Sequence, residues 1–158
     1  MPTVEFVFEI DAPLEKVWAF YDTVDTLFKL TPPDTKARLD GPPVPMRVGV
    51  IYKLKLRRWG IPLPTWQAEI TAYEPPRLFA DRQVPGKGPF KLWEHRHQFD
   101  SLPDNRTQLT DRVTYVMPFG PFGKIADWLF VRRDLEKMFA YRHRITRESL
   151  ERLPAAKP

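Results

Sequence analysis

The sequence predicts an α+β fold in which a curved antiparallel β-sheet wraps around one long C-terminal α-helix. Apolar and polar residues alternate over residues 3–10 and again in several segments between residues 48 and 116, which is the period of half-buried strands. Short turns containing Pro, Gly, Asn and Asp join these segments, as in an antiparallel meander. From about residue 122 to residue 153 the apolar residues recur at three- and four-residue steps, which predicts a helix with one apolar side.

Two short helices are expected between the first strand and the meander. Pro13 suits the first turn of a helix that carries an apolar stripe, and residues 22–30 are read as a second short helix that ends before Pro32. The meander strands are expected at residues 48–57, 66–72, 78–84, 90–100 and 106–116. A sheet with one apolar face must cover that face, and only the final helix is large enough to do so. A sheet that curls around a single helix closes imperfectly, so we expect a pocket between them.

Length and composition limit the classes of function. The 158 residues fit one domain, expected at residues 1–153 and followed by a disordered tail at residues 154–158. The chain has no Cys, which excludes disulfides, thiolate metal sites and Cys nucleophiles. It also has no phosphate-binding loop, no dinucleotide-binding glycine motif and no G-x-S-x-G. We therefore expect no cofactor.

The surface and the start of the chain indicate a cytoplasmic protein. No basic stretch followed by an apolar run opens the sequence, and no apolar run approaches the ~18 residues of a membrane span, so no integral membrane segment is expected. The net charge is +5. Lys53, Lys55 and Arg57 beside Trp59 are compatible with single-stranded nucleic acid, but a solvated outer strand face explains them more simply, so no nucleic-acid partner is expected. The 18 Pro, placed mostly in joins, hint weakly at a thermophilic source.

Polar side chains fall on the inner face of two neighbouring strands. His95 and His97 share a face with Trp93 and Phe99 because the side-chain period of a strand is 2. On the next strand Asp111 shares a face with Leu109, Val113 and Tyr115. A buried polar group costs about 1–3 kcal/mol unless it is paired, so this arrangement needs a reason.

Several interpretations of these inner polar residues stay open. They form a self-satisfied hydrogen-bonded core network, or they form the polar end of a ligand pocket. A catalytic acid–base set drawn from His95, His97, Asp111 and Tyr115 is a weaker alternative. A metal site with the two His and Asp111 as ligands is an equally weak alternative, and we expect no metal.

The inner faces of the strands and the last helix together supply the expected ligand-binding residues. These are Tyr52, Leu54, Trp66, Ile70, Phe79, Asp81, Trp93, His95, His97, Asp111, Val113, Tyr115, Trp128, Leu135, Met138 and Phe139. Most of them are apolar, as expected for a small-molecule pocket.

Three segments carry a resemblance to a known superfamily. They are FVFEIDAPLEKVWAFY at residues 6–21, TWQAEITAYEPPRLFADRQVPGKGPFKLWEHRHQF at residues 65–99 and TQLTDRVTYVMPFG at residues 107–120. With the order of elements, they resemble the START-like (SRPBCC, or polyketide cyclase/dehydrase-like) superfamily, in particular a bacterial ligand-binding branch, over nearly the whole chain. The resemblance implies the helix-grip fold and a hydrophobic cavity, and for most members no catalysis. A minority of members are aromatase/cyclases, hydrolases or ligand-dependent regulators.

The residues and the resemblance together favour a non-catalytic protein that binds a hydrophobic small molecule, such as a lipid, an isoprenoid or an aromatic, polyketide-like metabolite. Two alternatives stay open. One is an enzyme resembling the polyketide cyclases and dehydrases, with the inner His, Asp and Tyr as acid and base. The other is an interaction module that presents an apolar surface to a protein partner, whose identity the sequence does not indicate.

Overall fold

The computed structural model describes residues 1–126 and 130–151. In chain order its elements are β1 (Thr3–Ile10), α1 (Leu14–Tyr21), α2 (Val24–Lys29), β2 (Thr35–Leu39), β3 (Ile51–Arg58), β4 (Ile61–Pro62), β5 (Trp66–Glu74), β6 (Leu78–Gln83), β7 (Leu92–Leu102), β8 (Arg106–Val116), α3 (Gly120–Ala126) and α4 (Arg132–Leu150). This confirms the predicted α+β class and the order of one strand, two short helices, a meander and a C-terminal helix.

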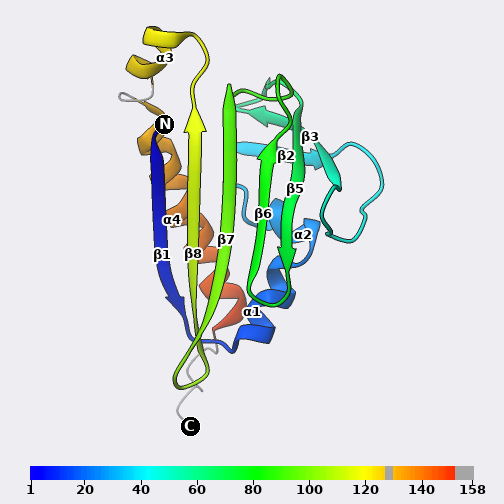
Figure 1. Cartoon of the computed structure of the whole chain (residues 1–158), viewed down its shortest axis with the longest axis vertical. Coiled ribbons are helices and arrows are strands. Elements are labelled where there is room, and N and C mark those ends of the chain that lie inside the picture. Colours follow the sequence, from blue (N-terminus) through cyan, green and yellow to red (C-terminus); the bar gives the residue numbers. More distant parts are fainter. Residues whose placement is uncertain (127–129, 152–158) are drawn as a thin grey trace.

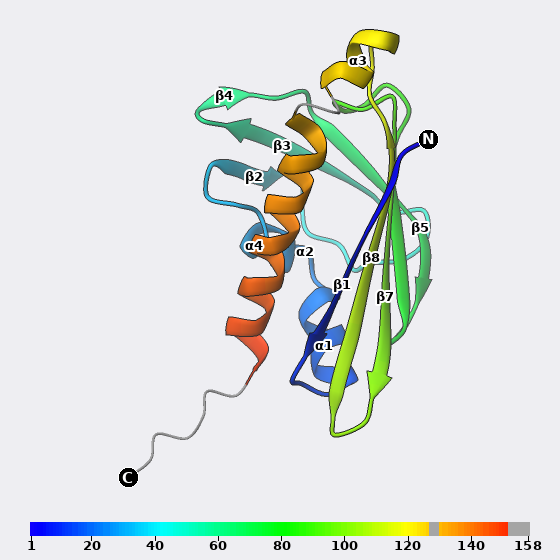
Figure 2. The same ribbon diagram turned by 90° about the vertical axis from the view of Figure 1, so that its left-hand side faces the viewer.

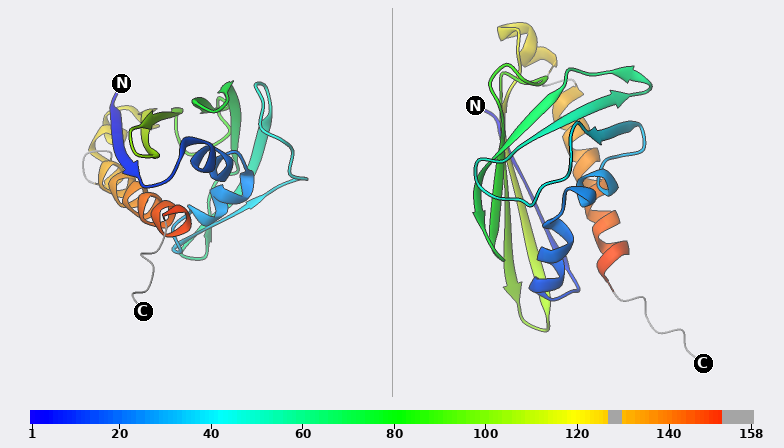
Figure 3. Two further views of the ribbon diagram at one scale, coloured as in Figure 1. Left: turned by 90° about the horizontal axis from the view of Figure 1, so that it is seen from below. Right: turned by 90° about the vertical axis from the view of Figure 1, so that its right-hand side faces the viewer.

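The strands form one antiparallel sheet in the order β1-β8-β7-β6-β5-β3-β2, with β4 paired to β3. The sheet is long and strongly curled, and α4 runs along its concave side (Figures 1 and 2). Seen from below, the strands bend around α1, α2 and α4 (Figure 3). From β2 to β8 the strands pair in chain order, apart from the short β4, because successive strands tend to lie side by side. Strand β1 instead pairs with the last strand, β8.

The period-2 pattern sets which side chains face inward. In β7 the buried residues are Trp93, His95, His97 and Phe99, and the residues between them are exposed. In β8 the alternate residues from Thr107 to Tyr115 are buried. On the outer face the Arg112 guanidinium donates to a Glu5 carboxylate oxygen across the β1–β8 pair. The inner face is therefore mainly apolar. Its buried polar side chains are His95, His97 and Asp111, which the sequence pattern had singled out, together with Gln83 and Thr107.

Helix α4 packs most closely against β1, at one edge of the sheet. The ring of Phe139 stacks on Phe6 with centroids 4.2 Å apart, and the ring of His143 stacks on Phe8 at 3.6 Å. Helix α4 also contacts α1, through a 2.7 Å hydrogen bond between the Tyr21 and Thr146 hydroxyls. This placement leaves the opposite half of the concave face for other contacts.

The C-terminal helical segment differs from its prediction. Among the described residues, the segment expected as one helix over residues 122–153 contains α3 and α4, and α3 lies beyond the end of the sheet rather than along it (Figures 1 and 2). The side chains of Phe122 and Ile125 are exposed there. A 3.6-residue apolar period predicts helix, but it does not show whether the sheet extends far enough for that helix to pack on it.

Strands β2 and β4 were not expected from the sequence. Strand β2 has no buried residue and β4 has two residues, one of them Pro62, so neither carries a strand pattern. The turn between β3 and β4 has positive φ at both Trp59 and Gly60, the backbone that a two-residue type I′ hairpin loop requires. Trp128 and the expected tail at residues 154–158 lie outside the described residues. Within the described part of the chain, no helix has both the length and the apolar character for crossing a bilayer.

The contact between α4 and β1 gives a test of the fold. Replacing Phe139, whose side chain is fully buried, by Ala removes its stacking on Phe6, and we expect the free energy of unfolding to fall by about 3–5 kcal/mol. Phe122→Ala is the matched control, because Phe122 is 79% exposed and its loss should change stability by no more than about 0.5 kcal/mol. Urea denaturation of both variants measures the difference. Equal losses would mean that α4 is not seated on the sheet as described.

Candidate ligand-binding pocket

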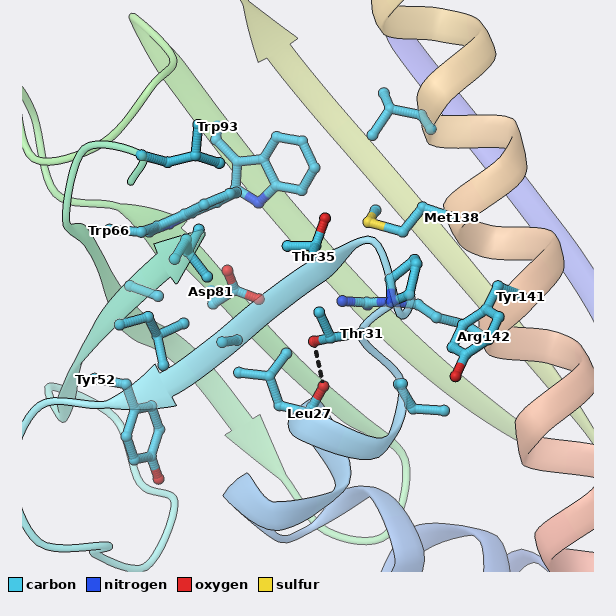
Figure 4. Close-up of a pocket in the computed structure, with 18 of the residues that line it drawn as sticks. Leu27, Thr31, Thr35, Tyr52, Trp66, Asp81, Trp93, Met138, Tyr141 and Arg142 are labelled. Atoms are coloured by element: carbon cyan, nitrogen blue, oxygen red, sulfur yellow. Dashed lines mark hydrogen bonds between the residues drawn. The ribbon is translucent and has the colours of Figure 1, made fainter. Parts of the chain in front are cut away.

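A pocket of about 900 Å³ lies between α4 and the concave face of the sheet. Strands β3, β5, β6 and β7 form one wall, α4 forms the facing wall, and α2 with the start of β2 closes one side (Figure 4). The volume is in the upper part of the range of small-molecule sites, about 300–1,000 Å³. The fold therefore contains internal room of the size that a lipid or a polycyclic compound needs.

Most of the pocket wall is aliphatic or aromatic. The principal apolar side chains are Leu27, Leu30, Tyr52, Leu54, Leu56, Trp66, Ile70, Phe79, Trp93, Leu135 and Met138. Those from the strands come from alternate positions on one face, so the pleat itself aims them inward. Two indoles meet edge to face, with the centroids of Trp66 and Trp93 5.1 Å apart. Such a wall favours an apolar occupant.

The room exists because α4 covers only part of the sheet. Its rings contact β1 through Phe139 and His143, whereas β3 and β5 lie across the pocket from it. Strand β5 also shifts register between Ile70 and Ala72, and such an irregularity bends a strand. A helix seated at one edge of a curled sheet thus leaves a space at the other.

A cluster of polar side chains lies at the inner end of the pocket. The sheet register pairs His95 with Asp81 of β6 and His97 with Asp111 of β8. The Nε2 atom of His95 is hydrogen-bonded to Oδ1 of Asp111 at 3.0 Å. The Nδ1 atom of His97 lies 2.7 Å from the same oxygen, at an angle outside hydrogen-bond geometry. Among these, Asp81 and His97 belong to the pocket wall.

The remaining imidazole nitrogens of these two histidines face Asp81. Oδ2 of Asp81 is 3.9 Å from Nδ1 of His95 and 4.0 Å from Nε2 of His97. The third histidine, His143 of α4, places Nε2 3.8 Å from the other oxygen of Asp111. Asp111 therefore lies on one side of the two imidazoles and Asp81 lies on the other.

Burial and neighbouring charges shift the pKa values of three groups in the cluster. Burial alone would raise the pKa of Asp111, but the charge of a protonated His97 and the hydrogen bonds that Asp111 accepts outweigh it, so that pKa lies well below its ordinary value. Burial raises the pKa of Asp81, although the charges of His95 and Arg142 partly oppose this. Burial lowers the pKa of His95, helped by the charge of His97. Asp111 is thus the fixed anion, and His95 is neutral near pH 7.

Among the described residues, four buried nitrogen atoms of the pocket wall have no hydrogen-bond partner, and Nε1 of Trp66 and Nε of Arg142 are two of them. The other two are Nε of Arg58 and Nδ1 of His97. The Arg142 side chain enters the pocket from α4 (Figure 4). At the rim, Arg58 holds the start of α4 to β3 through a 2.6 Å ion pair with Asp134. A buried donor without an acceptor is costly, so these donors suit an occupant that carries an acceptor.

The structure separates the expected ligand-binding residues into two groups. The pocket wall contains Tyr52, Leu54, Trp66, Ile70, Phe79, Asp81, Trp93, His97, Leu135 and Met138. His95, Asp111, Val113, Tyr115 and Phe139 are buried but do not line it. Asp111, Val113 and Tyr115 lie on β8, next to β1, and Phe139 of α4 stacks on β1. His95 lies on β7 between two wall residues, with its ring 5.4 Å from that of Phe139. Trp128 lies outside the described residues.

Sequence reasoning missed the wall residues from α2, from the segment that follows it and from the second half of α4. Leu27, Thr31, Thr35, Tyr141 and Arg142 all line the pocket (Figure 4). One signal was present, because Arg142 falls in the apolar stripe of the last helix and a cation there needs an explanation. For the other four, nothing in the local pattern distinguishes a pocket residue from an ordinary surface or core residue.

The sequence and the structure were compared with known protein families and solved structures, and both comparisons give matches over nearly the whole chain. The family model described as polyketide cyclase / dehydrase and lipid transport matches residues 1–156. Protein CV1439 from Chromobacterium violaceum is similar in structure, with a TM-score of 0.73, 12% identity, and 96% of this chain and 98% of that chain covered. No curated protein matches the sequence.

Two further solved structures share the fold. Protein TTHA0849 from Thermus thermophilus has a TM-score of 0.69 at 16% identity, over 93% of this chain and 95% of that one. The Zhui aromatase/cyclase from Streptomyces sp. R1128 has a TM-score of 0.66 at 17% identity, over 95% and 96%. At these identities the likeness shows the helix-grip fold alone.

The anion at the centre of the polar cluster gives the next test. Asp111→Asn keeps the shape of the side chain but removes the charge that both imidazoles contact, and we expect the free energy of unfolding to fall by about 3–5 kcal/mol. Asp104→Asn is the control, because Asp104 is exposed in a turn and Asn tolerates its φ of 62°. Thermal and urea unfolding report both values. A loss of no more than about 0.5 kcal/mol in Asp111→Asn would show that Asp111 does not hold the cluster together.

Proposed function

Because the chain belongs to the polyketide cyclase / dehydrase and lipid transport family, we propose that it binds a hydrophobic small molecule in the pocket between α4 and the sheet. The ligand class is a lipid, an isoprenoid or an aromatic, polyketide-like metabolite. The observation that carries the proposal is the internal space of about 900 Å³ with a mainly apolar wall. Such a space is unfavourable when it is filled by water and favourable when an apolar molecule fills it.

The energetics of the apolar part are simple. Each buried CH₂ group contributes about 0.8 kcal/mol, so roughly ten methylene groups supply about 8 kcal/mol, the scale of micromolar affinity. The polar end of the ligand would then face Asp81, His97 and Arg142, which lie together on the wall. The free donors of Trp66 and Arg142 favour a ligand whose polar end carries an acceptor oxygen. These polar groups would select among ligands of similar apolar bulk.

Filling the pocket should abolish binding. Ala68 of β5 lies on the wall, so Ala68→Trp places an indole in the space and should weaken binding of a fluorescent long-chain fatty acid analogue at least about tenfold, because several buried methylene groups lose their room. The emission of the probe during a titration measures its affinity. Native mass spectrometry of the purified protein, before and after extraction with organic solvent, tests for a retained apolar compound.

Lys53→Trp is the matched control for this variant. Lys53 lies on β3 with an exposed side chain, next to the wall residue Tyr52, so the same bulk is added on the outer face of the sheet. The control should bind the probe with wild-type affinity. The proposal fails if Ala68→Trp folds and binds the probe as tightly as Lys53→Trp does.

A catalytic role is the second candidate, and the polar cluster favours it. The raised pKa of Asp81 and its place on the pocket wall beside His97 suit proton transfer to or from a bound molecule, as in a cyclisation or a dehydration. Under this candidate, Asp81→Asn and His97→Gln each lower turnover of aromatic polyketide-type substrates by about a hundredfold or more, while the fatty acid analogue still binds. Unchanged turnover in both folded variants would exclude this use of the cluster.

A further inference from the structure

Three atoms capable of binding a metal converge where the pocket wall meets the sheet. One carboxylate oxygen of Asp81 and one nitrogen each of His95 and His97 lie within 4.8 Å of one another. Any three atoms with these separations have a common point within about 2.8 Å of each, and metal–ligand bonds of Zn²⁺ to N and O are about 2.0–2.2 Å. Small side-chain adjustments would therefore bring all three atoms to bonding distance.

The backbone itself places these three residues. His95 and His97 are two positions apart on β7, so their rings point to the same face, and the β6–β7 register sets Asp81 directly opposite His95. All three come from the interior of a sheet rather than from loops. Ligands held on rigid strands need little reordering when a metal binds.

Asp111 orients the two imidazoles for this role. Its Oδ1 atom lies 3.0 Å from Nε2 of His95 and 2.7 Å from Nδ1 of His97. A proton on each of these nitrogens is favourable, because a bare nitrogen this close to a carboxylate oxygen would be repelled. The nitrogens on the other side, Nδ1 of His95 and Nε2 of His97, are then the ones that face Asp81. A carboxylate behind each ligating imidazole is the usual outer partner of a metal-bound His.

The arrangement without a cation is poorly satisfied. Two imidazole nitrogens face a carboxylate oxygen at 3.9 and 4.0 Å, which is too long for a direct hydrogen bond. When both rings are neutral, three electron-pair donors point toward one another in a buried space. A cation between them would satisfy all three.

We propose that Asp81, His95 and His97 form a binding site for a divalent transition-metal ion of the Zn²⁺ type. Two nitrogen donors and one carboxylate suit zinc and its neighbours better than Ca²⁺ or Mg²⁺. Three protein ligands leave at least one coordination position free, and Asp81 and His97 border the pocket. The free position therefore faces the pocket, where a ligand oxygen or nitrogen has access to it.

This assignment departs from the expectation from sequence. No metal was expected, and Asp111 was the only carboxylate considered as a third ligand. The structure instead places Asp111 behind the imidazoles and Asp81 in front of them. Metal binding does not depend on the proposed function, because its test uses the metal alone.

The experiment is a calorimetric titration of the chelator-treated full-length protein with Zn²⁺. We expect one Zn²⁺ per chain and a rise in the unfolding temperature on its addition. Asp81→Asn and His97→Gln should each weaken Zn²⁺ binding at least about a hundredfold, and Asp111→Asn should weaken it about 10- to 100-fold by loss of orientation. Co²⁺ in place of Zn²⁺ gives a visible absorption spectrum that reports its ligands. That spectrum should persist in Asp111→Asn and disappear in His97→Gln.

Asp104→Asn is the control, because Asp104 is exposed in a turn and is not one of the three ligands. It should keep wild-type stoichiometry and affinity within a few-fold. Near-ultraviolet circular dichroism identifies which variants are folded. If only one of Asp81→Asn and His97→Gln folds, that variant alone decides the question. The inference is overturned if the wild-type chain binds no Zn²⁺, or if a folded Asp81→Asn or His97→Gln variant binds it as tightly as Asp104→Asn does. Loss of fatty acid binding with Zn²⁺ binding intact would count against the proposed function only.

Discussion

One helix cannot cover the concave face of an eight-stranded, strongly curled sheet, and the rest of the structure depends on this constraint. Helix α4 is seated at the β1 edge by the stacking of Phe139 on Phe6 and of His143 on Phe8. The apolar concave face of β3, β5 and β6 is then not covered by α4 and must be covered by other segments. Helix α2 and the start of β2 supply part of it, and the remaining volume is the pocket. Packing at one edge of the sheet thus creates room at the other.

The same constraint gives the polar cluster access to the pocket. Had α4 lain over β6 and β7, the two imidazoles and their carboxylates would be enclosed in a dry core as a purely structural network. With α4 at the β1 edge, Asp111 stays buried as the anion that holds the network, while Asp81 keeps 19% of its side chain exposed. Low polarity around the cluster strengthens each charge interaction within it. The buried side of the network therefore contributes to stability, and the side that borders the pocket is accessible to a ligand.

Much of this organisation was predictable from the sequence, for physical reasons. The strand period of 2 places His95, His97 and Asp111 on one inner face without any knowledge of the fold. It cannot give the lateral position of α4, so it could not separate Val113 and Tyr115, which lie outside the pocket wall, from residues that line it. Nor does a single-sequence pattern contain the register between strands, which places Asp81 opposite His95. The separation of α3 from α4 could not be predicted, because the apolar residues of both helices follow the same helical period.

The central claim is that α4 and the strands β3 and β5 hold a stable internal space rather than closing on each other. The most direct measurement is a crystal structure of the protein grown with a long-chain alkyl bromide, whose bromine is located by anomalous scattering. The account predicts a single bromine site among the wall residues, near Trp66, Ile70 and Met138, with α4 still seated on β1. A structure with Met138 packed directly on Ile70 and no bromine between them would contradict it.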